Sequence, residues 1–93
     1  VGDNAVITYN PDGEAIKTEY AAEGGNDGIV VTEDGTKYVS SVRFGSVSKI
    51  VPGKDAEVIA TGIPSAASMC YDSVQNQLVI PLNGNFALAF IKL

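Results

Sequence analysis

Short runs of β-branched and aromatic residues recur along the whole chain, and turn-forming Gly, Pro, Asn or Asp separates them. Runs of this length and composition are typical of β-strands. Segments such as Asn10-Pro11-Asp12-Gly13 and Val51-Pro52-Gly53-Lys54 supply the glycine or proline that tight hairpin turns need. The pattern predicts no helix, and it predicts strands over Ala5–Asn10, Ala15–Tyr20, Gly28–Thr32, Lys37–Val42, Ser46–Val51, Glu57–Ala60, Ser68–Tyr71, Gln77–Leu82 and Phe86–Lys92.

The strand pattern repeats with a period of about forty residues. After a shift of that length, Tyr38-Val39 falls on Leu78-Val79, and Ile50-Val51 falls on Phe90-Ile91. A strand-rich repeat of ~40–45 residues is typical of a β-propeller blade, whose four antiparallel strands need neighbouring blades to cover both faces. The sequence therefore predicts an all-β fold made of about two four-stranded antiparallel blades of a β-propeller.

The predicted strands do not fill a whole number of blades. If the strands of a blade are lettered A to D outward from the centre, the order along the chain is C, D, then A to D, then A, B, C. We expect outer strands of a truncated blade over residues 1–23, a complete blade over 24–62 and three strands of a last blade over 63–93. A ring needs at least ~4 blades. Either the remainder of a longer propeller completes it, or further copies of the chain do, for example three copies in one six-bladed ring.

Composition excludes several classes of function. The chain has six Lys and Arg against eleven Asp and Glu, and its basic residues are dispersed, so nucleic acid is not an expected partner. It has no His, which excludes a Ser-His-Asp arrangement or a His-containing zinc site within the chain. No apolar stretch of ~18 residues predicts a membrane span, and no signal peptide is visible. We expect the lone Cys70 to be a buried core residue.

The alternating strand directions sort the loops between two faces of the expected ring. Links into strand A and links from B to C emerge on the same face, which then carries Asn26, Asp27, Arg43 and Ser68. Asp27 comes just before an inner strand, so its carboxylate is expected to face the central channel, where it suits a hard divalent cation. The alternative is that Asn26-Asp27-Gly28 is an ordinary turn whose polar side chains bind local backbone amides.

The other polar and aromatic residues have simpler interpretations. Arg43 suits an anionic ligand through its planar guanidinium, or it is a solvated loop residue. Glu33-Asp34 and Lys54-Asp55 fall on the opposite face and are interpreted as solvated turn charges. Packing between blades is the expected role of most aromatic residues in the strands, namely Tyr9, Tyr38, Tyr71, Phe86 and Phe90.

The run from Asn26 to Ile50 resembles a blade of the SMP-30/gluconolactonase family. In that family Pro-Asp-Gly, an apolar triplet, Asp-x-x-Gly and an aromatic-Val pair open a late blade of a six-bladed propeller. The corresponding residues here include Asp27-Gly28, Ile29-Val30-Val31 and Tyr38-Val39, with Asn26 in place of the Pro and Thr32 in place of the second Asp.

This resemblance implies that the complete ring is a metal-dependent hydrolase of sugar lactones. Asp27 would be a catalytic residue and a ligand of the divalent metal, Ca²⁺ in the first instance, with Zn²⁺, Mn²⁺ or Mg²⁺ as alternatives. Asn26, Arg43 and Ser68 would be its neighbours at the substrate. The isolated chain is expected to be inactive, because one carboxylate does not hold a catalytic cation. The alternative is a non-catalytic binding or scaffold propeller of the NHL type, since a shared fold does not fix function.

Overall fold

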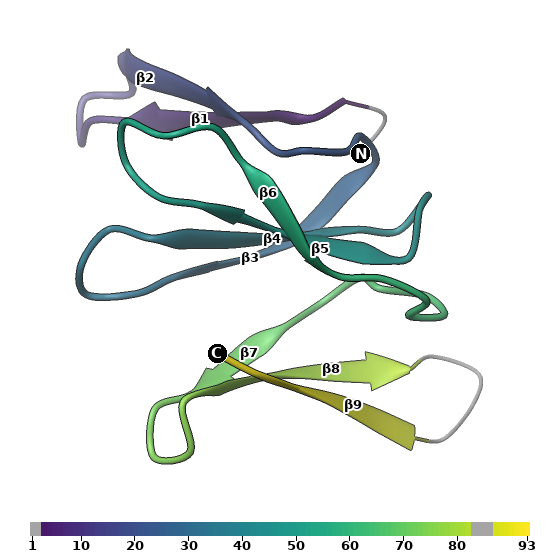
Figure 1. Ribbon diagram of the computed structural model, residues 1–93. Coiled ribbons are helices and arrows are strands. Elements are labelled where there is room, and N and C mark those ends of the chain that lie inside the picture. Colours follow the sequence, from purple (N-terminus) through teal and green to yellow (C-terminus); the bar gives the residue numbers. More distant parts are fainter. Residues whose placement is uncertain (1–2, 83–86) are drawn as a thin grey trace.

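The computed structural model describes residues 3–82 and 87–93 of the chain. These residues form β-strands and no helix, which confirms the all-β prediction (Figure 1). Phe86, where the last strand was expected to begin, lies outside the described residues. The strands are β1 (Ala5–Tyr9), β2 (Ala15–Tyr20), β3 (Asn26–Val31), β4 (Lys37–Ser41), β5 (Ser46–Ile50), β6 (Glu57–Ala60), β7 (Cys70–Asp72), β8 (Gln77–Leu82) and β9 (Ala87–Lys92).

The strands form three antiparallel sheets in chain order: β1-β2, β3-β4-β5-β6 and β7-β8-β9. Figure 1 shows these sheets one above another, with the four-stranded sheet in the middle. In each sheet, strands that follow one another along the chain are hydrogen-bonded neighbours. No helix long and apolar enough to cross a membrane occurs in residues 3–82 or 87–93.

The two central strands of the middle sheet, β4 and β5, are buried on both faces. Successive side chains of a strand point to opposite faces, so Tyr38 and Val39 of β4 pack on different sides. Tyr38 belongs to a cluster that reaches the third sheet, and Val39 belongs to one that reaches the first sheet. The buried members of the larger cluster are Tyr38, Val47, Ile63, Ala66, Leu78 and Ile80, and those of the smaller are Ala21, Val39 and Ile50.

Buried serines of β4 and β5 bond the middle sheet to the segments on either side of it. Ser48 Oγ accepts a hydrogen bond from the amide of Ala22 at 3.0 Å, on the link between the first and second sheets. Ser40 Oγ donates to the carbonyl of Ala67, on the link to the third sheet, and accepts from the amide of Gly28 at 2.8 Å. These small hydroxyl side chains satisfy backbone groups that close sheet packing removes from water.

The outer faces of the first and third sheets are uncovered in this chain, and this bears on the expectations for Cys70 and for the aromatic residues. Cys70 is exposed rather than buried, because it pairs with Val79 on the face of the third sheet that points away from the core. Tyr9 and Phe90 are 58% and 59% exposed, so within this chain they do not pack between sheets, and their packing against further blades stays a prediction. Tyr38, in contrast, packs between sheets as expected.

Candidate functional site

Asp27 lies in the first half of β3, at a β-bulge. Asn26 pairs with Ser41 and Ile29 pairs with Val39, so Asp27 and Gly28 together lie opposite Ser40. A bulge of this kind bends the strand and redirects a side chain. The side chain of Asp27 is exposed beside a small cavity of about 150 Å³ between β1 and β3. Its lining residues are Ala5, Val6, Asn26, Asp27, Gly28, Ile29 and Val39.

The Asp27 carboxylate accepts no hydrogen bond from any residue that the structure describes, and this sets it apart from the turn aspartates. Asp34 accepts hydrogen bonds from the Thr32 hydroxyl at 2.7 Å and the Thr36 amide at 3.1 Å. Asp72 accepts one from the Val74 amide at 3.0 Å. The interpretation of Asn26-Asp27-Gly28 as an ordinary turn is therefore wrong, because these residues are in a strand and Asp27 binds no local amide.

Hydrogen bonding lowers the pKa of both turn aspartates. The Thr32 hydroxyl is the largest cause for Asp34, and the backbone amide of Gln75 is the largest for Asp72. Each hydrogen bond favours the ionised carboxylate over the protonated form. The lone pairs of these two aspartates are thus committed to their own turns, whereas those of Asp27 are available to a ligand.

Asn26 holds the first sheet against the second. Its Nδ2 donates to the carbonyl of Ala5 at 3.3 Å, and its backbone amide donates to the carbonyl of Asp3 at 3.2 Å. Its Oδ1 is buried and accepts no hydrogen bond within the described part of the chain. Asn26 therefore lines the cavity beside Asp27, with its side-chain Nδ2 bonded to the first sheet and its Oδ1 without a partner in the described residues.

Gly28 is required for the approach of two backbone segments. A Cβ atom at this position would lie 2.3 Å from the carbonyl oxygen of Ala67 and 3.1 Å from the amide nitrogen of Met69. A separation of 2.3 Å is far below van der Waals contact, so only glycine fits without a backbone shift. Within the Asp27-Gly28 pair, the glycine is structural.

Arg43 and Ser68 lie at the same end of the sheets as Asn26. The amide of Val42 donates a hydrogen bond to the carbonyl of Gly25 at 2.9 Å. The amide of Ile63 donates one to the carbonyl of Gly45, also at 2.9 Å. These bonds join the link before β3, the β4–β5 turn and the link before β7, as the alternation of strand directions predicts. Both Arg43 and Ser68 are exposed, and neither lines the cavity beside Asp27.

Asp27 belongs to no metal-binding cluster in the part of the chain that the structure describes. No group of three or more His, Cys, Asp or Glu residues able to hold a metal ion occurs in the described ranges. Calcium takes 6–8 oxygen ligands, and magnesium demands an octahedral set. Asp27 therefore fits as one ligand of a divalent cation, and most of the ligand set would have to come from other parts of a ring or from water.

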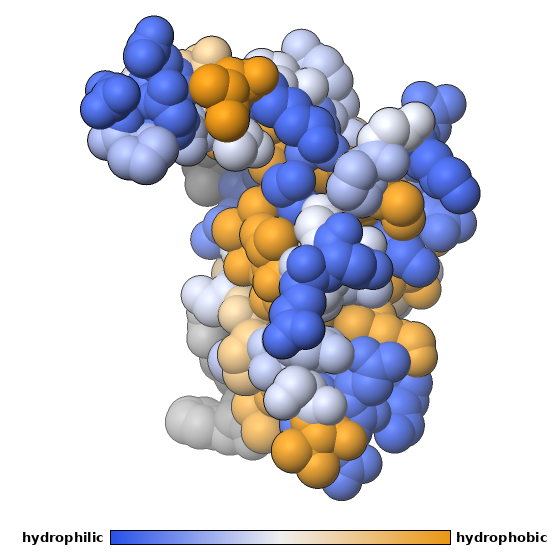
Figure 2. All heavy atoms as spheres, turned by 90° about the vertical axis from the view of Figure 1, so that its left-hand side faces the viewer, coloured by the Kyte–Doolittle hydropathy of each residue, from blue (hydrophilic) through white to orange (hydrophobic). Residues whose placement is uncertain are grey.

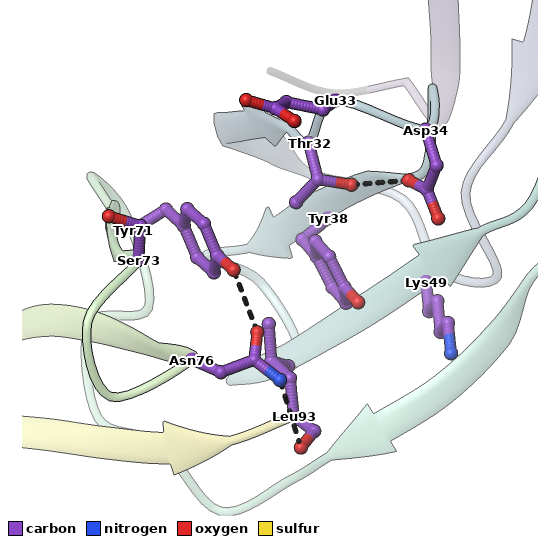
Figure 3. Close-up of a pocket in the computed structure, with 9 residues that line it drawn as sticks. All are labelled: Thr32, Glu33, Asp34, Tyr38, Lys49, Tyr71, Ser73, Asn76 and Leu93. Carbon is purple, nitrogen blue, oxygen red and sulfur yellow. Dashed lines mark hydrogen bonds between the residues drawn. The ribbon is translucent and has the colours of Figure 1, made fainter.

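A larger groove, which the sequence did not reveal, lies at the opposite end of the sheets between the second and third sheets (Figure 3). Its volume is about 570 Å³. Glu33 and Asp34, interpreted above as solvated turn charges, form part of its wall. The alternation of strand directions places the β3–β4 turn, which carries these two residues, on the same face as the turn after β7. This shared position was the sequence signal from which the groove could have been predicted. The lining residues are Thr32, Glu33, Asp34, Tyr38, Lys49, Tyr71, Ser73, Asn76 and Leu93.

No protein-family model matches the chain, and no curated protein sequence matches it significantly. The resemblance to the SMP-30/gluconolactonase family thus rests on the motif around Asp27 and on the strand pattern. Membership of that family and lactone hydrolysis stay predictions.

Proposed function

We propose that the chain is part of a β-propeller in which Asp27 is a ligand of a divalent cation, and that the complete ring hydrolyses sugar lactones. The observation that carries this proposal is the free carboxylate of Asp27. It is exposed and lies on a bulge of β3, an edge strand of the four-stranded sheet. An edge strand of a blade lines the central channel when it is the innermost strand.

The packing of the sheets supports the propeller part of the proposal. The middle sheet buries side chains on both faces, as a blade between two neighbours does. The strands of each sheet follow chain order, and the links between sheets run from the last strand of one to the first strand of the next. Further sheets of the same kind would cover the exposed outer faces.

The chemistry available at Asp27 supports the hydrolase part. Carboxylate oxygens suit Ca²⁺ first, and Zn²⁺, Mn²⁺ or Mg²⁺ as alternatives. A bound cation supplies Lewis acidity toward a lactone carbonyl and lowers the pKa of a bound water. Asn26, Arg43 and Ser68 belong to the same end and are the substrate neighbours that this chain could contribute.

The test compares lactone hydrolysis by the complete natural protein that contains this sequence with hydrolysis by two variants. Asp27→Asn keeps the shape of the side chain and removes its charge, so turnover of gluconolactone with added Ca²⁺, Mn²⁺ or Zn²⁺ should fall by about 100-fold or more. Asp55→Asn is the matched control, because Asp55 is an exposed aspartate in the turn between β5 and β6. Unchanged turnover in Asp27→Asn would refute the role of Asp27.

A non-catalytic binding propeller is the second candidate, and the groove between the second and third sheets favours it. That groove has a polar lining and lies away from Asp27. Calorimetric titration of the complete protein with Ca²⁺, Zn²⁺, Mn²⁺ and Mg²⁺ in turn separates the two candidates. Heat of binding that disappears in Asp27→Asn favours the hydrolase, and no binding of any of the four cations favours the binding protein.

A further inference from the structure

The groove between the second and third sheets has two walls from different parts of the chain (Figure 3). One wall comes from the β3–β4 turn, with Tyr38 of β4 and Lys49 of β5. The other wall comes from Tyr71 of β7 and the following turn, which contributes Asn76. Its volume of about 570 Å³ falls within the ~300–1,000 Å³ typical of small-molecule sites.

Hydrogen bonds fix both walls before any ligand arrives. On the first wall, the Thr32 hydroxyl donates to Asp34 Oδ1 at 2.7 Å. On the second, the Tyr71 hydroxyl donates to Asn76 Oδ1 at 2.7 Å, and Asn76 Nδ2 donates to the carbonyl of Leu93 at 3.5 Å (Figure 3). Asn76 adopts a φ of 52°, a left-handed conformation that asparagine tolerates better than most residues. The polar groups are therefore held in place, which lowers the entropic cost of binding.

One hydroxyl, that of Tyr38, is open to the groove. Tyr38 is only 6% exposed, and its ring packs in the core between the sheets. Its hydroxyl has no hydrogen-bond partner among the described residues, although the side chain forms part of the groove lining. A tyrosine with a buried ring and an accessible hydroxyl presents one fixed polar group, which can both donate and accept a hydrogen bond. The Tyr38 hydroxyl is thus available to a ligand in the groove.

The free groups around Tyr38 define the chemistry of such a ligand. Lys49 brings a cation that forms no ion pair within the described residues, and Glu33 brings an exposed carboxylate. Donors and acceptors are therefore both present, and the lining carries two carboxylates, of Glu33 and Asp34, against one ammonium, which disfavours an anionic ligand. The ring of Tyr71, half-buried, offers an apolar face. A molecule with many hydroxyls, no net charge and an apolar ring face matches this lining.

We propose that this groove binds a neutral mono- or disaccharide. The sugar hydroxyls would pair with the Tyr38 hydroxyl, the Lys49 ammonium and the Glu33 carboxylate, and the ring would pack against Tyr71. This binding site stands apart from lactone hydrolysis, because the groove shares no lining residue with the cavity beside Asp27.

The test is an NMR titration of the full chain with the methyl glycosides of glucose, galactose, mannose and N-acetylglucosamine. At least one glycoside should shift the amide signals of the groove turns, with a Kd on the order of 1 mM. Tyr38→Phe removes one oxygen and keeps the packed ring, so it should weaken binding about fivefold. Tyr9→Phe is the matched control, because Tyr9 is exposed on the first sheet, and it should leave the Kd unchanged.

Three outcomes would overturn the proposal. The first is no groove shift with any glycoside, and the second is equal affinity of wild type and Tyr38→Phe. The third is binding of methyl glucuronide or inorganic phosphate alone, lost in Lys49→Met, which would identify an anion site. Binding that persists in Asp27→Asn and in EDTA separates this site from the proposed cation site.

A glycan array that presents the same sugars at chain ends distinguishes the source of the ligand. Binding of free glycosides alone would identify a small-molecule ligand, and binding in both formats would identify the end of a glycan. Either result supports a neutral sugar site, provided that Tyr38→Phe weakens it.

Discussion

Gly28 sets the distance between the middle sheet and the link to the third sheet. We expect Gly28→Ala to destabilise the fold by about 3 kcal/mol, because the added Cβ would meet the backbone carbonyl of Ala67 at 2.3 Å. Gly13→Ala is the control: nothing lies within 4 Å of the added atom, so only its positive φ costs about 1 kcal/mol. Urea denaturation of both variants measures the difference. Equal losses would contradict the packing role of Gly28.

The same residue shows how much of the candidate site the sequence could predict. The order of residues placed Asp27 before an inner strand, and the structure finds it at the beginning of β3. The bulge at Asp27-Gly28 was not predictable, because it depends on Ala67 approaching from a distant link. The unpaired hydroxyl of Tyr38 was hidden for a similar reason: it becomes a site feature only when the third sheet packs beside β4.

At the level of elements, an ion pair joins β2 of the first sheet to β4 of the second. Lys37 Nζ lies 2.7 Å from Glu19 Oε1, and the two side chains are only 13% and 10% exposed. Lys17, on the same strand as Glu19, has its Nζ 3.5 Å from Glu19 Oε2. The hydrogen bond from Lys37 is the largest cause that lowers the pKa of Glu19 below its ordinary value of 4.5. The pair therefore couples sheet packing to the charge of Glu19.

This coupling predicts a pH dependence of stability. Because the folded state depresses the pKa of Glu19, the stabilising contribution is complete above pH 4.5 and is lost as the pH falls through the lower folded value. Glu19→Gln should lower the urea midpoint at neutral pH and flatten its decline below pH 4.5. Glu57→Gln, at an exposed position of β6, should follow the wild-type profile. A wild-type decline that Glu19→Gln leaves unchanged would rule out this origin.

The existence of the strands was easier to predict than their ends. The bounds of β8 are as predicted, and β4 ends at Ser41 rather than Val42. In β8 the buried Leu78 and Ile80 alternate with less buried residues, because the pleat dictates which side chains face the core. β3 begins at Asn26 rather than Gly28, since the bulge lets pairing with β4 extend past Asp27. β7 begins at Cys70 rather than Ser68, because the preceding backbone turns toward the middle sheet, where Ser40 bonds Ala67. Both differences arise from contacts between sheets, which a local pattern does not contain.

At the level of the whole molecule, two apolar faces lack a cover. On the first sheet, Ile7, Tyr9, Ile16 and Tyr20 are all at least 45% exposed. The strand register places them on the side opposite Val6, which packs toward the middle sheet. On the third sheet, Leu88 and Phe90 are 55% and 59% exposed. Figure 2 shows hydrophobic side chains reaching the surface between hydrophilic ones at several heights of the stack.

Apolar faces of this kind draw proteins together, because each Å² removed from water contributes about 25 cal/mol. The chain of residues 1–93 alone should therefore self-associate in sedimentation experiments, with a mass that rises with concentration. Ile16→Glu and Phe90→Glu should each shift the distribution toward monomer by placing a charge on one of the two faces. Val74→Glu is the control, because Val74 is 91% exposed in the β7–β8 turn and belongs to neither face. A monomer at every concentration would mean that the outer faces need no cover, and the case for a ring of stacked sheets would lose its energetic basis.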